Sequence, residues 1–422
     1  MDIKYLYALY LRTNGISTDT RKITAGSVFF ALKGANFNGN KFAEEALRKG
    51  AEYAVIDEKE FYIDSRTILV DDVLKTLQLL ANYHRKQLDI PFIGLTGSNG
   101  KTTTKELMKA VLSTEYKVHA TEGNLNNHIG VPLTLLSLKE DTQIAVIEMG
   151  ANKPGDIREL CEIAEPTHGI ITNIGKAHLG GFGGLEGVIK TKTELYEFLR
   201  ETSGHAFVNG EDELLMQRSR GISRTTYCTQ DFCDVWAKNI SSDLFLEIEY
   251  QNRKIHTKLV GDYNFQNALA AICVGKYFNV SDSQIQQALE QYIPDNNRSQ
   301  IIKTTRNTLI MDAYNANPTS MEKAILNISK AQNVLLILGD MKELGKWTKE
   351  AHQKIVDLVK TIEGADAVLV GENFSHTQNH NFLTFLTAKD ALKHFENHPV
   401  KGRTILLKGS RSMQLETLSE VF

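Results

Sequence analysis

A glycine-rich segment constrains the fold of this chain more than any other part of its sequence. Residues 94–104 read Gly-Leu-Thr-Gly-Ser-Asn-Gly-Lys-Thr-Thr-Thr, and they lie between the apolar run Pro91–Leu95 and the helix-forming run Lys105–Leu112. Glycines let backbone N–H groups turn toward phosphate oxygens, and a helix N-terminus adds positive potential. The order of strand, loop and helix therefore predicts a phosphate-binding loop, although the strict G-x-x-x-x-G-K-[ST] motif would need glycine where Leu95 stands.

The side chains of this loop have distinct expected roles. We expect Lys101 to contact the β- and γ-phosphates of a nucleotide and the Thr102 hydroxyl to hold Mg²⁺. The alternative is a plain surface turn at Gly-Lys-Thr, which the flanking strand and helix disfavour. The candidate nucleotide-binding residues of the loop are Gly97, Ser98, Asn99, Gly100, Lys101, Thr102 and Thr103.

Apolar and helical patterns predict two α/β units in the first three quarters of the chain. Residues 1–88 mix short apolar runs with an amphipathic stretch, and a helix over Val73–Leu88 is expected to close this small unit. From 89 to 297, buried-strand runs alternate with helical periods, as in a parallel sheet covered on both faces. A β-rich flap is expected on this second unit between Ala206 and Leu259.

A third unit follows the turn-prone stretch Pro294–Arg298. Strands and helices alternate again over residues 298–422, which predicts a Rossmann-like domain. Within it, Thr319–Glu322 fits a helix capping box and is expected to be structural. The expected fold is therefore α/β with three domains: a small N-terminal α/β domain, a central P-loop domain with a parallel sheet, and a C-terminal Rossmann-like domain.

Composition excludes several classes of protein. The 48 Lys and Arg residues against 51 Asp and Glu give a net charge of −3, which disfavours a dedicated nucleic-acid-binding protein. Four scattered cysteines without a C-x-x-C pair indicate neither a zinc site nor a disulfide framework, so a cytoplasmic setting is expected. No run of about 18 apolar residues predicts a membrane span, and the N-terminus lacks the apolar core of a secretory signal.

Three downstream side chains are candidates for catalysis. Glu148 follows the apolar run Ile144–Ile147, so it is expected at the carboxyl end of a parallel strand, where it could help to hold magnesium. His178 follows another strand-like run, and both a structural and a functional role stay open for it. Lys190 and Lys192 lie on an amphipathic helix and by their spacing alone belong to a solvated face.

Together the motifs of this chain resemble those of the Mur ligase family over nearly its whole length. The phosphate loop is common to Mur ligases and their folylpolyglutamate synthetase relatives. Residues 124–127, 312–318, 339–341 and 408–411 resemble members that add D-alanyl-D-alanine. The matching motifs are residues 96–104, 123–134, 148–151, 172–179, 312–318, 338–345 and 408–411.

The resemblance implies one task for each domain. Residues 1–88 would bind the uridine side of a UDP-sugar, 89–297 would bind ATP, and 298–422 would close over ATP and bring the dipeptide. The implied activity is an ATP-dependent ligase that adds D-alanyl-D-alanine to UDP-N-acetylmuramoyl-tripeptide through an acyl phosphate. It would act as a cytoplasmic monomer, without nucleic acid and without a membrane span.

The resemblance also implies site residues. Thr102 and Glu148 would hold one Mg²⁺, and His178 with a carbamylated Lys192 would hold a second. The implied catalytic residues are Lys101, Glu148, His178 and Lys192. Residues implied to bind ATP outside the loop are Asn264 and Asn267 on the adenine side and Arg298 and Asp312 near the phosphates or ribose. Residues implied to bind the other substrates are Ser17, Asp19, Arg21, Asn124, Asn126, Asn127, Tyr314, Asn315, Lys408, Ser410 and Arg411.

Other functions stay open at this point. A folylpolyglutamate synthetase or another Mur ligase would add a single amino acid. A P-loop NTPase switch would need a distinct Walker-B acid and a guanine-reading N-K-x-D motif, and the sequence contains no N-K-x-D. A non-catalytic sugar-nucleotide-binding module would not need Lys101, Thr102, Glu148 and His178 together.

Overall fold

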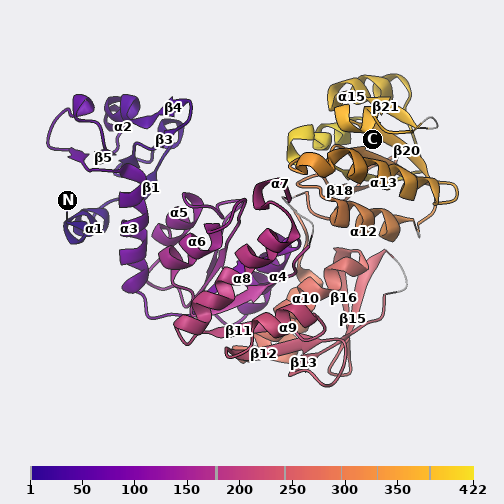
Figure 1. Cartoon of the computed structure of the whole chain (residues 1–422), viewed down its shortest axis with the longest axis horizontal. Helices are drawn as coiled ribbons and strands as arrows, with labels where there is room; N and C mark the ends of the chain where they lie inside the picture. The colour runs from indigo at the N-terminus through magenta and orange to yellow at the C-terminus, as the bar shows by residue number, and fades with distance from the viewer. Residues whose placement is uncertain (1, 176–178, 242–243, 296, 330, 380–381) are drawn as a thin grey trace.

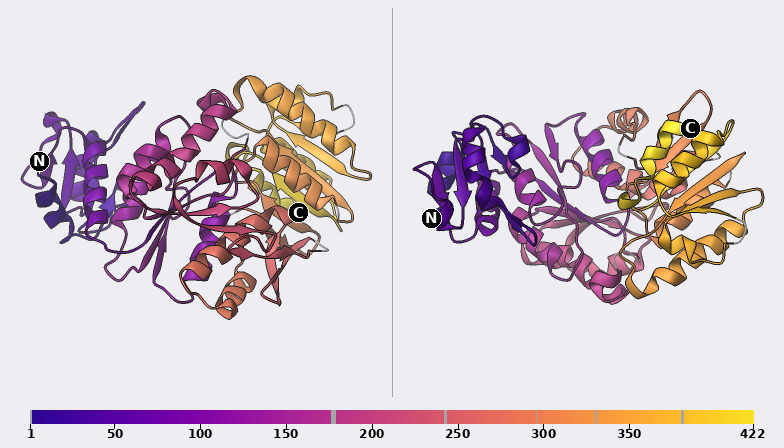
Figure 2. Two further views of the ribbon diagram at one scale, coloured as in Figure 1. Left: turned by 60° about the horizontal axis from the view of Figure 1, so that its bottom comes forward. Right: turned by 90° about the horizontal axis from the view of Figure 1, so that it is seen from above.

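The computed structural model describes residues 2–175, 179–241, 244–295, 297–329, 331–379 and 382–422. The N-terminal and C-terminal parts lie at opposite ends of the molecule, with the central part between them (Figure 1, Figure 2). Each part contains a mainly parallel sheet with helices packed against it. The expected α/β fold with three domains is confirmed.

The N-terminal part is a small parallel sheet in the strand order β1-β2-β5-β6. Helix α3 begins where the Asp72 side chain accepts a hydrogen bond from the Lys75 amide, and it ends at Lys86, two residues before the expected Leu88. The strands are β1 (Ile16–Ser17), β2 (Val28–Phe30), β5 (Tyr53–Ile56) and β6 (Thr67–Leu69), with a β3–β4 hairpin (Lys33–Gly34, Phe37–Asn38). The helices are α1 (Ile3–Tyr10), α2 (Ala43–Arg48) and α3 (Val73–Lys86).

The central part is built on a seven-stranded parallel sheet in the order β13-β12-β11-β10-β7-β9-β8. Its strands are β7 (Phe92–Thr96), β8 (Val118–Ala120), β9 (Ile144–Glu148), β10 (His168–Ile171), β11 (His205–Asn209), β12 (Ser223–Cys228) and β13 (Val235–Trp236). Its helices are α4 (Lys101–Leu112), α5 (Gly130–Leu136), α6 (Asp156–Ala164), α7 (Leu179–Phe182), α8 (Leu185–Glu201), α9 (Glu213–Arg218), α10 (Phe265–Tyr277) and α11 (Asp282–Gln291).

The expected β-rich flap over 206–259 is wrong for its first half. Strands β11, β12 and β13 extend the main sheet as parallel strands, and only β14 (Lys238–Asn239), β15 (Phe245–Tyr250) and β16 (Arg253–Val260) form a separate antiparallel sheet. The physical reason lies in burial, because Ala206, Phe207 and Val208 are consecutive and all buried. Such a run fits a strand covered on both faces, whereas a flap strand would alternate.

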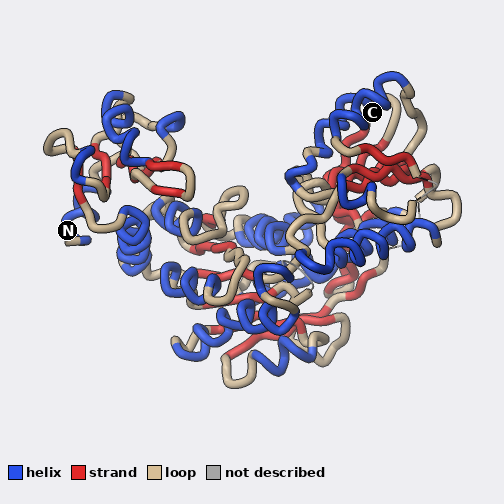
Figure 3. Tube along the Cα trace, turned by 45° about the horizontal axis from the view of Figure 1, so that its top comes forward, coloured by secondary structure: helices blue, strands red, loops and turns tan. Residues whose placement is uncertain are grey.

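Helices cover both faces of the central sheet (Figure 3). Successive side chains of a strand point to opposite faces, so Ala145 and Ile147 of β9 join one hydrophobic cluster while Ile144 and Val146 join the other. Helices α4 and α10 pack on the second face, and α5, α6 and α8 on the first. With both faces covered, the carboxyl edge of the sheet is the place where loops can form a site.

The C-terminal part has a six-stranded sheet in the order β17-β18-β22-β19-β20-β21, parallel except for β17. Helix α12 begins one residue after Asn317, whose side chain forms a capping box with Ser320. The capping box expected at Thr319–Glu322 is therefore wrong, because Pro318 already occupies the first turn. The strands are β17 (Gln300–Lys303), β18 (Thr308–Asp312), β19 (Val334–Gly339), β20 (Asp366–Val370), β21 (Leu383–Phe385) and β22 (Thr404–Lys408). The helices are α12 (Pro318–Ile328), α13 (Thr348–Lys360), α14 (Glu372–Ser375) and α15 (Ala388–Asn397).

The cysteines differ from expectation at one place. Cys228 and Cys233 form a disulfide, although the sequence analysis expected none. Their separation of five residues places them on the two sides of the turn between β12 and β13, where their side chains meet. Cys161 and Cys273 are free and buried. Among the described residues, no helix is long and apolar enough to cross a membrane.

The N-terminal and central parts share one hydrophobic core. A single cluster of buried side chains joins Phe30 and Val55 of the N-terminal sheet, Leu77 of α3, and Leu135 and Leu160 of the central helices. Helix α3 makes this connection because it packs on α5 and α6 as well as on β2. The C-terminal sheet is covered by two further clusters.

Because the N-terminal and central parts share a core, we expect a cavity made in that core by substitution to destabilise both parts. Leu77→Ala removes a side chain that is 0% exposed, and we expect it to lower the free energy of unfolding by about 2–5 kcal/mol. Leu79→Ala on the same helix removes a side chain that is 48% exposed and should change it by less than about 0.5 kcal/mol. In hydrogen exchange, Leu77→Ala should accelerate amides of both β5 and α6. Faster exchange in β5 alone would contradict a shared core.

Candidate active site

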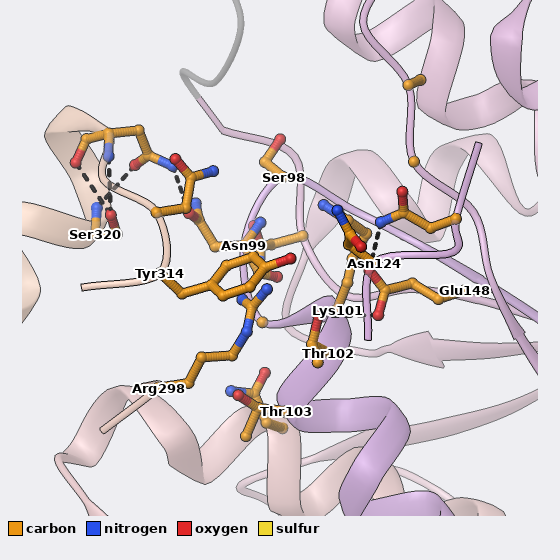
Figure 4. Close-up of a pocket in the computed structure, with 18 of the residues that line it drawn as sticks. Ser98, Asn99, Lys101, Thr102, Thr103, Asn124, Glu148, Arg298, Tyr314 and Ser320 are labelled. Carbon is orange, nitrogen blue, oxygen red and sulfur yellow. Dashed lines mark hydrogen bonds between the residues drawn. The ribbon is translucent and has the colours of Figure 1, made fainter. Parts of the chain in front are cut away.

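A cavity of about 790 Å³ lies between the central and C-terminal parts. The phosphate loop and the end of β9 form its central wall, and residues from the linker and the ends of β18 and β22 form the facing wall. Figure 4 shows Lys101, Thr102 and Glu148 on the first wall and Arg298 and Tyr314 on the second. Two expected strand ends and the expected loop therefore meet in one cavity.

The phosphate loop is held by contacts that only glycine permits. Gly97 has φ +150°, and a Cβ there would lie 1.9 Å from the Thr172 hydroxyl oxygen. Gly100 has φ +79°, and a Cβ there would lie 2.3 Å from Asn267 Oδ1. Because any larger residue would push the loop away from β10 and α10, the two glycines fix the position of the backbone at the start of α4.

Glu148 stands at the carboxyl end of β9 and faces Thr102. Its carboxylate accepts hydrogen bonds from the Thr102 hydroxyl at 2.9 Å and from Asn126 Nδ2 at 2.8 Å. Its backbone N–H donates to the Thr121 hydroxyl at 2.9 Å, which fixes the end of the strand. The side chain is almost fully buried, at 1% exposed.

The pair Thr102 and Glu148 fits Mg²⁺. Both offer oxygen atoms, which Mg²⁺ prefers, and Mg²⁺ characteristically keeps water and phosphate oxygens as its other ligands. Within the part of the chain that the structure describes, no group of three or more His, Cys, Asp or Glu could hold a metal.

Lys101 begins helix α4 and is held by its own loop. Its ammonium donates to the Gly97 carbonyl at 2.7 Å. Burial lowers the pKa of this ammonium, and the nearby Glu148 carboxylate opposes that shift. The positive charge is thus kept next to the loop amides, where a phosphate would lie.

Lys192 lies on α8 and is buried, not solvated. It is 3% exposed, and its Nζ lies 5.8 Å from the ring centre of Phe182. Burial lowers the pKa of this amine well below its usual value, and the charge of Lys101 lowers it further. The solvated face expected from spacing alone is therefore wrong for Lys192, whereas Lys190 is exposed. The other candidate ligand, His178, lies outside the described residues.

The C-terminal wall presents a guanidinium stacked on an aromatic ring. Arg298 Cζ lies 3.8 Å from the ring centre of Tyr314, and Arg411 Cζ lies 5.8 Å from the same ring. The Arg298 Nε is buried and has no hydrogen-bond partner. Stacking holds the guanidinium in place at the cavity, which Arg298 and Tyr314 both line.

Several residues implied to bind ligands are already engaged within the protein. Asp312 accepts from Lys408 Nζ at 2.6 Å, so these two charges neutralise each other. Asn267 accepts from the Thr104 hydroxyl and donates to Asn264, and both asparagines also line the cavity. Asn127 Oδ1 accepts from the backbone amides of Ile129 and Gly130 at the start of α5.

The remaining predicted residues divide between cavity and periphery. Lining the cavity are Ser98, Asn99, Thr103, Asn124 and Asn315. Ser410 accepts from the Lys342 amide and is buried. Ser17, Asp19 and Arg21 lie in the N-terminal part, where Arg21 pairs with Asp19 at 2.7 Å.

Sequence reasoning missed two asparagines that shape this site. Asn173 accepts from the Asn99 amide at 3.1 Å, and Asn317 donates to the Asn99 side chain at 2.6 Å. Both belong to motifs that were recognised, at residues 172–179 and 312–318. A usable signal for Asn317 was the Asn-Pro pair, since asparagine before an N1 proline is a typical helix cap.

Family models match most of the chain. The catalytic domain of the Mur ligase family matches residues 12–85, the Mur ligase middle domain matches 95–275, and the Mur ligase glutamate ligase domain matches 297–411. These matches leave only short segments of the chain uncovered.

Relatives and solved structures agree with the family models. The chain is 35% identical to the UDP-N-acetylmuramoyl-tripeptide–D-alanyl-D-alanine ligase of Bacillus subtilis (strain 168), over 96% of this chain and 92% of the relative. It resembles the crystal structure of MurF from Acinetobacter baumannii with a TM-score of 0.86 at 32% identity, covering 96% and 92% of the two chains. It also resembles the MurF ligase of Thermotoga maritima in complex with ADP, with a TM-score of 0.85 at 27% identity and 98% and 97% coverage.

The glycine contacts predict the effect of one methyl group on nucleotide binding. Gly100→Ala should weaken ADP binding by at least about tenfold, because Cβ would strain the backbone and displace Asn267. Gly364→Ala is a matched control, since Gly364 has φ +72° with nothing within 4 Å of a Cβ. Titration calorimetry with ADP and Mg²⁺ measures both. Equal affinities for the two variants would contradict the proposed role of the contact.

Proposed function

The chain belongs to the Mur ligase family, and we infer that it is an ATP-dependent ligase that joins D-alanyl-D-alanine to UDP-N-acetylmuramoyl-tripeptide. The reaction forms a peptide bond in peptidoglycan precursor synthesis. The observation that carries this inference is the match over 96% of the chain to a ligase with that name, together with an intact phosphate-loop cavity.

We propose that the reaction runs through an acyl phosphate. The free carboxylate of the tripeptide attacks the γ-phosphorus of ATP, the bond to the β-phosphate oxygen breaks, and ADP leaves. The amine of D-alanyl-D-alanine then attacks the acyl carbon, phosphate leaves, and the amine loses a proton. The first step brings a carboxylate to a polyphosphate, so cations must offset the repulsion.

The residues on the two walls fit this requirement. The loop and Lys101 would meet the phosphates from the central wall, and the Arg298 guanidinium, which lines the cavity, would meet them from the other wall. Thr102 and Glu148 would hold Mg²⁺, which supplies positive charge to phosphate oxygens. No protein nucleophile is needed, because the attacking groups belong to the substrates.

A second metal site at Lys192 and His178 is part of the proposal. A lysine with a lowered pKa keeps more of its amine neutral, and a neutral amine can add CO₂ and lose a proton to give a carbamate. The carbamate carries two oxygens and a negative charge, which suits Mg²⁺. Burial of Lys192 beside Phe182 supports this reading.

We also propose how the substrates are divided among the domains. Residues 1–88 would hold the uridine end through Ser17, Asp19 and Arg21, 89–297 would hold ATP, and 298–422 would bring the dipeptide. Near the uridine motif, Asn38 and Asn40 stand where the family resemblance would place aspartate and histidine. We propose that the protein acts in the cytoplasm as a monomer, and that one chain suffices because it supplies both walls of the cavity.

Phosphate release tests the function directly. With UDP-N-acetylmuramoyl-tripeptide, ATP and Mg²⁺, release should depend on added D-alanyl-D-alanine. A single D-alanine or L-amino acid in place of the dipeptide is the matched control. Release that is independent of the dipeptide, or turnover only with a single amino acid or with folate and glutamate, would overturn the assignment.

The carbamate role predicts chemical rescue. Lys192→Ala should lower turnover by at least about 100-fold, because a metal ligand is lost, and short carboxylic acids should partly restore it. Lys190→Ala, an exposed lysine on the same helix, should retain turnover and gain nothing from added acid. An active Lys192→Ala enzyme would eliminate the carbamate role.

A further inference from the structure

One hydrogen bond joins the phosphate loop directly to the C-terminal part. Asn317 Nδ2 donates to Asn99 Oδ1 at 2.6 Å, across 218 residues of sequence. Both residues line the cavity, Asn99 on its central wall and Asn317 on the C-terminal wall.

The backbone of Asn99 is fixed, so its side chain has a defined direction. Its N–H donates to Asn173 Oδ1 at 3.1 Å, and its carbonyl accepts from the Thr172 hydroxyl at 2.6 Å and from Asn173 Nδ2 at 2.9 Å. All three contacts come from the end of β10 and the residues after it. The loop is thereby held from the central side, and the Asn99 amide is left to face the C-terminal part.

The orientation of the Asn317 amide is also fixed. Its Oδ1 accepts from the Ser320 amide at 2.9 Å as the cap of α12, and the Asn317 N–H donates to Ser320 Oγ at 3.1 Å. Because the oxygen is used by the cap, the NH₂ group must point the other way, to Asn99. One side chain therefore both starts α12 and reaches the phosphate loop.

The bridge brings two helix N-termini together. Asn99 directly precedes Gly100, the cap of α4, and Asn317 is the cap of α12. Helix N-termini carry partial positive charge, so two that face one cavity repel each other unless an anion lies between them. A neutral amide pair can hold them at one separation without adding charge, and bound phosphate would turn the repulsion into attraction.

We propose that Asn99 and Asn317 form a positioning contact that sets the C-terminal domain against the phosphate loop in the reactive, closed arrangement. The inference rests on the proposed function for its kinetic consequence. Neither residue is assigned a part in bond making. The contact raises the fraction of enzyme molecules that adopt the closed arrangement after ATP has bound.

Kinetic constants of cap-preserving variants test the proposal. Asn317→Ser keeps a good helix cap but is too short to reach Asn99, and Asn99→Ala removes the acceptor without touching the cap. Each should lower kcat by roughly two- to tenfold, the effect of one neutral hydrogen bond, with the KM for ATP changed less than about twofold. The double variant should be no worse than either single one.

A matched control separates the bridge from the cap. Ser320→Ala weakens the cap and leaves the Asn99–Asn317 bond in place, so kcat should fall less than in Asn317→Ser. Additive losses in the double variant, or a raised KM for ATP at unchanged kcat, would overturn the proposal, because they indicate two independent contacts to the nucleotide.

Small-angle scattering gives a readout that needs no ligase activity. Addition of ADP and Mg²⁺ should shift the wild-type chain toward a more compact form, and the shift should be smaller in Asn317→Ser and Asn99→Ala than in Ser320→Ala. Equal compaction in the wild-type chain and all three variants would overturn the proposed positioning role of the contact. The wild-type chain could show no dipeptide-dependent phosphate release while the compaction still differs among the variants as described. That result would refute the proposed function and support the positioning contact.

Discussion

The close packing of Gly97 and Gly100 against Thr172 and Asn267 is the constraint on which the site depends. It holds the loop backbone at a single position between β10 and α10, so that α4 starts at Lys101 with its N-terminus in the cavity. That position lets the Thr102 hydroxyl reach Glu148 at the end of β9. Strand ends, loop and helix are thus placed relative to one another before any ligand is bound, which is the preorganisation that charge stabilisation in catalysis requires.

The molecule joins two bodies around this site. The N-terminal and central parts share a core through α3. Two other clusters cover the C-terminal sheet, one of them including Val260 of β16, and the C-terminal part also meets the central part at the cavity. Trp347, from the turn before α13, packs on the shared core, so the contact between the two bodies is apolar there and polar at Asn99 and Asn317. Opening and closing of the second body would admit substrates and then exclude water from the acyl phosphate.

The sequence predicted the parts of this site that have local signals. The prediction of a strand, glycine loop and helix over residues 91–112 depended only on neighbouring residues, and so did the prediction that Glu148 ends a strand. Both features lie where they were expected. Burial of Lys192 could not be predicted from helical spacing, because the cover is provided by Phe182 from another helix. The engagement of Asn267 with Thr104 and of Asp312 with Lys408 also depends on partners far away in sequence. The parallel placement of β12 and β13 was missed because β12 has mixed polarity, as in an antiparallel flap, whereas the consecutive buried residues 206–208 of β11 do fit a covered strand.

The central claim is that the chain activates a substrate carboxylate by phosphorylation and contributes cations in place of a nucleophile. The most direct measurement uses tripeptide substrate labelled with ¹⁸O at both oxygens of the reacting carboxylate. The account predicts that each phosphate released carries one ¹⁸O atom and that the new amide carbonyl keeps the other. Unlabelled phosphate would contradict it, because the departing carboxylate oxygen would then not have been transferred to phosphorus.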